Sequence, residues 1–76
     1  NPTSDIVNIR LKSNKSQNYT VNIYNSMGES VKKESILSAR ELNKSISLFN
    51  YANGVYLVNV IDGNGNFYNQ HIVLNR

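Results

Sequence analysis

The stretch that decides the fold is Gly54-Val55-Tyr56-Leu57-Val58-Asn59-Val60-Ile61, the longest run dominated by β-branched and aromatic residues in the chain. Such residues fit a pleated, half-buried surface. Turn-forming residues flank the run on both sides, with Asn53 before it and Asp62-Gly63-Asn64-Gly65 after it. The stretch therefore predicts a β-strand.

Both faces of this predicted strand are apolar. Its residues divide into two alternating sets, Tyr56, Val58 and Val60 on one face and Val55, Leu57 and Ile61 on the other. A strand of this kind is usually central in its sheet and covered on both sides, or it leaves one face open to a partner. We favour the covered central strand.

Alternation of apolar and polar residues predicts further strands, at residues 5–12, 19–26, 29–34, 45–49 and 67–74. The third of these is short and charged, as expected of an edge strand. Residues 13–18 are polar without a period and predict a loop. Residues 35–42 fit a helical turn or an irregular connection as well as a strand, and we expect them to be loosely extended.

The last two strands are expected to form a hairpin whose register depends on the length of its loop. A three-residue loop, Gly63-Asn64-Gly65, places Tyr68, Ile72 and Leu74 on the face of Tyr56, Val58 and Val60. A two-residue loop places them on the opposite face. We favour the three-residue loop. At the entry to the strand, Gly54 is expected to need a positive φ.

These elements predict an all-β fold. A chain of 76 residues makes one small domain. No connection is long enough for a βαβ unit. The expected architecture is a small antiparallel immunoglobulin-like β-sandwich of six to seven strands. Its predicted core consists of Val7, Ile9, Leu11, Val21, Ile23, Ile46, Leu48, Tyr56, Val58, Val60 and Ile72.

Composition excludes several functions. The net charge of +3 is spread along the chain, and Lys32-Lys33 is the only basic pair, so nucleic acid is not an expected partner. The chain has no cysteine. It also has no apolar run of the roughly 20 residues that a transmembrane segment needs. Residues 1–4 have no signal-peptide features, and we expect the chain to be a piece of a longer one.

The sequence offers little material for catalysis or metal binding. His71 is the only histidine, and no carboxylate lies near it in the sequence. Residues 62–66 begin like a calcium loop, but Phe67 and Val73 occupy the positions that require glycine and glutamate. A hairpin turn explains the same residues. We therefore expect no enzyme activity, no metal and no cofactor.

Two sequence blocks follow one another along the chain. The first has the form Val-x-Ile-Tyr-(Asn/Asp)-x-x-Gly-x-x-Val and the second x-Gly-x-Tyr-x-Val. The matching residues are Val21, Ile23, Tyr24, Asn25, Gly28 and Val31, then Gly54, Tyr56 and Val58. In this order and at these spacings the blocks resemble a known family, the type A C-terminal sorting domain of cargo proteins of the bacterial type IX secretion system (Por secretion system sorting domain). Asn1-Pro2 matches the end of the family's opening Pro-Asn-Pro. Asn69-Gln70-His71 stands where the family commonly has a lysine pair.

The resemblance implies that residues 1–76 form a single C-terminal sorting domain of a larger secreted protein. It would direct that protein through the periplasm of a Gram-negative bacterium to the outer-membrane translocon, and then to the cell surface or outside the cell. A sortase-like peptidase would remove the domain in many such proteins. The implied sorting-motif residues are Gly28, Val31, Gly54, Tyr56 and Val58. Because the last strand is added to an otherwise complete set of hairpins, we predict that its end carries C-terminal recognition, through Ile72, Val73, Leu74, Asn75 and Arg76.

One alternative belongs to a different class, an adhesion or carbohydrate-binding sandwich. Tyr24, Tyr51 or Tyr68 would then serve as a stacking platform. For the sorting function, the exposed edge of residues 67–74 is a candidate for recognition by strand addition.

Overall fold

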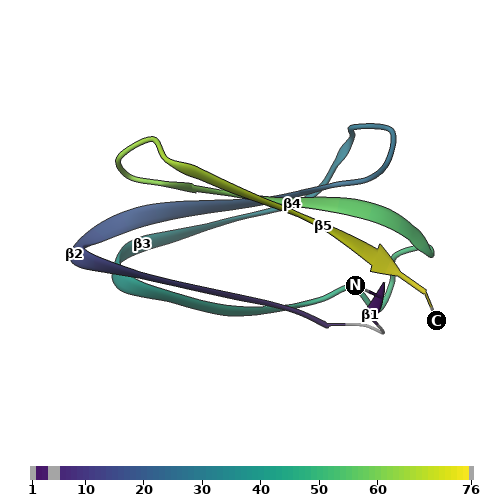
Figure 1. Ribbon diagram of the computed structural model, residues 1–76, viewed down its shortest axis with the longest axis horizontal. Helices are drawn as coiled ribbons and strands as arrows, with labels where there is room; N and C mark the ends of the chain where they lie inside the picture. The colour runs from purple at the N-terminus through teal and green to yellow at the C-terminus, as the bar shows by residue number, and fades with distance from the viewer. Residues whose placement is uncertain (1, 4–5, 76) are drawn as a thin grey trace.

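A computed structural model describes residues 2–3 and 6–75 as strands joined by short turns (Figure 1). The strands are β1 (Pro2–Thr3), β2 (Ile6–Tyr24), β3 (Ser30–Ser47), β4 (Gly54–Asp62) and β5 (Phe67–Leu74). They form one sheet in the order β1-β5-β4-β2-β3. All neighbours are antiparallel except β1 and β5, which are parallel.

The all-β prediction is confirmed, and the described residues contain no helix. The strand β4 lies in the middle of the five, as predicted, and β3 is an edge strand. The predicted six to seven strands are not confirmed, because the described residues form five. These five strands belong to a single hydrogen-bonded sheet, so the predicted immunoglobulin-like sandwich of two sheets is not confirmed either.

The difference in strand number arises in the long hairpin of β2 and β3. The sequence predicts a loop at residues 13–18 and a loosely extended segment at residues 35–42, but both segments lie inside these strands. The pairing shifts between Lys12 and Gln17, which lie opposite Glu41 and Ala39. Four residues of β2 thus face a single residue of β3. Extra residues on one strand bend it, so the polar stretch forms a bend and not a chain break.

The bend folds the hairpin so that its far half lies over the rest of the sheet (Figure 1). The core lies between the two halves. Its buried residues are Val7, Tyr19, Val21, Ile23, Leu42, Ile46, Leu48, Tyr56, Val58, Val60 and Leu74. Ile9, Leu11 and Ile72, also predicted as core, are only partly buried against this cluster. Sequence analysis did not include Tyr19, Leu42 or Leu74 in the core.

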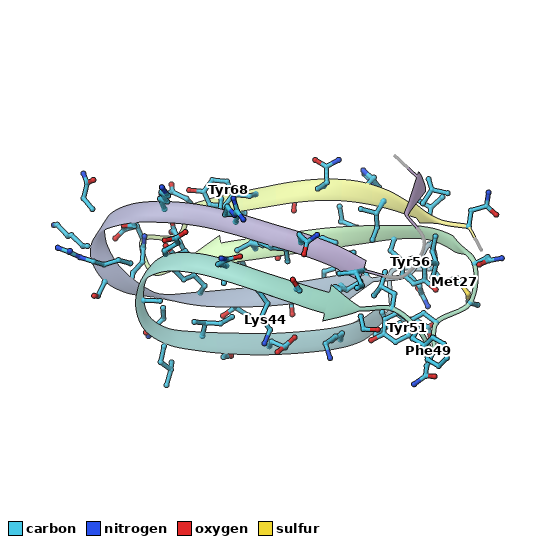
Figure 2. The ribbon with its side chains drawn as sticks, turned by 90° about the horizontal axis from the view of Figure 1, so that it is seen from below. Met27, Lys44, Phe49, Tyr51, Tyr56 and Tyr68 are labelled. Carbon is cyan, nitrogen blue, oxygen red and sulfur yellow. The ribbon has the colours of Figure 1, made fainter. Side chains whose placement is uncertain are left out.

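The two halves of β3 are joined by an ion pair. Lys44 Nζ lies 2.9 Å from a carboxylate oxygen of Glu34, and Lys32 lies 3.9 Å from the same group. Figure 2 shows Lys44 between the two halves of this strand. Partly exposed pairs of this kind contribute less than about 1 kcal/mol. The pair connects the two layers along the β3 edge.

The second face of β4 is not covered, contrary to expectation. Val55 is 44% exposed, and Leu57 and Ile61 are half-buried. The opposite face, with Tyr56 and Val58, is buried. The bent hairpin covers only one side of the sheet. The strand β4 therefore leaves one face open and presents partly apolar side chains to solvent.

The predicted register of the last hairpin is confirmed. Val60 pairs with Tyr68 and Tyr56 pairs with Ile72, which places these side chains on one face. The N–H of Asp62 donates to the carbonyl of Asn66 at 3.0 Å and closes a three-residue loop.

Candidate recognition surface

The first sorting-motif block forms the turn between β2 and β3. The N–H of Asn25 donates to the carbonyl of Glu29 at 2.9 Å, and the N–H of Gly28 donates to the carbonyl of Asn25 at 3.0 Å. The Asn25 side chain accepts from the N–H groups of Met27 and Glu29. Gly28 has a φ of 81°, as the last residue of such a three-residue loop requires. The Asn-x-x-Gly spacing is therefore explained by turn geometry.

The turn between β4 and β5 repeats this arrangement. Asp62 replaces Asn25, and Gly65, with a φ of 87°, replaces Gly28. The Asp62 carboxylate accepts hydrogen bonds from the N–H groups of Asn64 and Asn66, from the Asn66 amide and from the Tyr68 hydroxyl. The described residues contain no cluster of side chains able to hold a metal ion. The observed hydrogen bonds fit the hairpin interpretation of this segment.

Burial of Asp62 opposes its ionisation, but hydrogen bonds from Asn66, Asn64 and Tyr68 outweigh that effect and lower the pKa of the carboxyl. A group with a lowered pKa stabilises the fold above its unfolded pKa and loses that contribution as the pH falls. We expect the stability difference between the natural chain and Asp62→Asn to be largest near pH 7. It should shrink below about pH 4, the ordinary range of aspartate. Urea unfolding at pH 7 and pH 3 measures it, and a constant difference would contradict the prediction.

The second motif block forms the loop that leads into β4. Gly54 has a φ of 154°, a conformation that residues with side chains rarely adopt, which confirms the expected positive φ. The buried Tyr56 donates its hydroxyl hydrogen to the carbonyl of Ala52 at 2.5 Å. A tyrosine that bonds back to the backbone a few residues upstream resembles the tyrosine corner of immunoglobulin-like sandwiches. Gly54 and Tyr56 therefore hold the loop against the core.

Val31 completes the first block and lies at a bulge. Ile23 pairs with Lys32 and Tyr24 pairs with Ser30, so Val31 lies between the two paired positions. The Tyr51 hydroxyl donates to the carbonyl of Val31 at 3.1 Å. The rings of Tyr51 and Tyr56 lie 5.9 Å apart (Figure 2). Val31 thus links the edge strand β3 to the loop before β4.

Two tyrosines allow a matched test of this loop. Removing the Tyr56 hydroxyl by Tyr56→Phe should lower the free energy of unfolding by about 1 kcal/mol, because the carbonyl of Ala52 loses its donor. Tyr19 is also buried, but its hydroxyl has no hydrogen-bond partner in the structure. Tyr19→Phe should therefore leave stability unchanged or raise it. Urea unfolding of both variants decides, and equal losses would contradict the assignment.

All five sorting-motif residues thus have a role in maintaining the fold. Of these, Gly28, Val31 and Gly54 shape turns and a bulge, while Tyr56 and Val58 are buried.

The C-terminal recognition residues divide into two groups. Leu74 is buried and Ile72 is partly buried, whereas Val73 is 38% exposed and Asn75 is exposed. Arg76 lies outside the described residues. The accessible part of this segment is therefore its outward-facing side and its end, and β1 lies beside it (Figure 1).

The exposed residues at the end of β5 adjoin the uncovered face of β4. Val73 pairs with Val55, and His71 pairs with Leu57, which in turn pairs with Tyr24 of β2. We call these five residues the outer apolar surface. Of these five, sequence analysis named Val73 as a recognition residue and Tyr24 as a motif residue and stacking candidate. The signal for Val55 and Leu57 was present, since they form the second apolar set of β4.

The three tyrosines considered for carbohydrate stacking do not form one platform. Tyr51 packs on Tyr56 near the start of β4. Tyr68 lies at the other end of the hairpin, and its hydroxyl contacts Asp62 (Figure 2). Tyr24 is half-buried and pairs with Leu57, so the three tyrosines do not combine into one stacking surface.

The fold and this surface define a small all-β domain whose motif residues maintain turns and core. A family model described as the secretion system C-terminal sorting domain matches residues 1–75. The chain belongs to this family, the C-terminal sorting domain of type IX secretion. No curated protein and no solved structure matches the chain significantly. Among residues 2–3 and 6–75, no helix has the length and apolar character to cross a membrane.

Proposed function

We propose that the outer-membrane translocon recognises the exposed end of β5 together with the outer apolar surface. As a member of the C-terminal sorting-domain family of type IX secretion, the domain is a sorting signal, which implies interaction with that machinery and export to the cell surface or the extracellular space. In this proposal the domain crosses the periplasm folded, at the end of a larger protein. It is a substrate and not an enzyme, and a sortase-like peptidase removes it after translocation.

The exposure of Val73 and Asn75 beside Val55 carries this proposal. A recognition surface needs accessible side chains, and the motif residues Tyr56 and Val58 are buried. Apolar groups that lie together at a surface typically mark contact sites between proteins. The end of the last strand brings such groups next to the terminal residues, where a partner reaches both at once.

The direct test is export of a reporter. A protein fused before residues 1–76 should reach the surface or medium of a type IX-competent strain and remain inside a strain that lacks the translocon. The matched control is the same reporter without the domain. Export in both strains, or in neither, would contradict the proposal. The size of the exported reporter shows whether a peptidase removes the domain.

A further inference from the structure

A groove opens between β5 and the first half of β2. Its volume is about 280 Å³, and β2 residues from Val7 to Leu11 line one side while β5 residues from Tyr68 to Gln70 line the other. Val58 and Val60 of β4 form part of its lining. The core residues Ile9 and Leu11 are only partly buried there. The ion pair of Lys44 and Glu34 lies along the β3 edge, and the groove lies along the β5 edge.

The β5 side of this groove is an open strand edge. Asp62 and Asn66 form a hydrogen-bonded pair, and such pairs alternate along an antiparallel ladder with pairs whose backbone groups point away. In this register, the backbone N–H and C=O groups of Tyr68, Gln70 and Ile72 point to β4. The backbone groups of the intervening residues Asn69 and His71 therefore point away from β4, toward the side of β5 where no strand pairs with them.

Two observations support this assignment. The Gln70 side chain donates to the carbonyl of His71 at 3.2 Å, so a neighbouring side chain covers an outward-pointing acceptor. Val73, the next outward residue, lies opposite Pro2 of β1. In a parallel pair, when the backbone groups of one residue point to the neighbouring strand, those of the residue opposite it point away. Pro2 therefore fits opposite Val73 without losing a hydrogen bond.

The strand β1 sets the direction and register of the chain along this edge. It runs parallel to β5, with Pro2 opposite Val73 and Thr3 opposite Leu74. Each step back along the chain before β1 is therefore one step back along β5. Extended back in this register, the positions two and four places before Asn1 fall beside Gln70 and Tyr68.

We propose that the segment immediately before Asn1 in the intact protein fills this groove as a parallel extension of β1 on the β5 edge. The inference rests on the proposed place of the domain at the end of a longer protein. The added strand covers Ile9 and Leu11. Its carbonyls four and two places before Asn1 accept from the amides of Asn69 and His71, and its N–H two places before Asn1 donates to the carbonyl of Asn69. Its residues two and four places before Asn1 face the groove and are apolar. The peptidase must then cut upstream of this strand, outside the folded domain.

Hydrogen exchange on the intact purified protein tests the proposal without any export step. The amides of Asn69 and His71 should exchange about five- to tenfold more slowly than if they faced solvent, the effect of one net hydrogen bond. Two variants separate register from general damage. Proline two places before Asn1 removes an N–H that points to β5 and should release this protection. Proline one place before Asn1 removes an N–H that points away and should not.

The Val58 amide, which pairs with Gln70, reports whether each variant is folded. Its protection should stay unchanged in both. Fast exchange at Asn69 and His71 in the natural protein, or equal effects of the two proline variants, would overturn the proposal. Protection that rises with protein concentration would also overturn it, since the groove would then be filled by a second copy. Loss of export alone bears on the sorting function and not on this strand.

Discussion

Replacing Val58 with alanine should lower the free energy of unfolding by about 2–4 kcal/mol, by analogy with other large-to-small changes in protein cores. Val58 is 4% exposed and lies between the two halves of the bent sheet. The change removes two methyl groups from a close-packed site and leaves a cavity. A loss of this size is a large share of the stability of so small a domain.

Val55 supplies the matched control for this prediction. It lies on the same strand three residues earlier, but it is 44% exposed. Val55→Ala should therefore change the free energy of unfolding by less than about 1 kcal/mol. Urea unfolding of the two variants, with the slope compared as well as the midpoint, measures the difference. Equal losses would mean that both faces of β4 are packed alike.

Removing Asn75 and Arg76 should abolish export and leave stability nearly unchanged. Asn75 is exposed beyond the end of β5, whereas the last core contact is made by Leu74, which is 1% exposed. The truncation therefore removes Asn75, which a partner can reach, together with the residue that follows it, and keeps the strand that completes the core. The expected result is a reporter retained in the periplasm at an unchanged melting temperature.

The control for this truncation is Leu74→Ala in the full-length domain. It creates a core cavity and should lower the melting temperature clearly. Normal export of the truncated domain would show that the signal lies elsewhere in the domain. Retention accompanied by a large loss of stability would mean that the last two residues support the fold.

Much of the fold was predictable because it depends on local patterns. The alternation in residues 54–61 and 67–74, with the spacing of Gly63 and Gly65, was enough for the central hairpin and its register. The bend in β2 and β3 was not predictable in this way. Residues 13–18 have no period, and only their pairing across the hairpin, four residues against one, makes them a bend within a strand.

The candidate site was predicted less well, for a physical reason. The motif pattern marks residues such as Gly28 and Tyr56, whose types are required by positive φ and by a buried hydrogen bond. Sequence alone does not separate a residue required by the fold from one required by a partner. The exposure of Val55 and Leu57 depends on which side of the sheet the long hairpin covers, and that choice is made by tertiary packing.

The central claim is that the outward-facing end of β5 is recognised while the motif residues maintain the fold. The most direct measurement is export and melting temperature of a reporter fusion carrying Val73→Glu, with Leu37→Glu as control. Leu37 is 72% exposed on β3, away from the end of β5. The account predicts that both variants fold, that Leu37→Glu is exported and that Val73→Glu is retained. Normal export of folded Val73→Glu would contradict it.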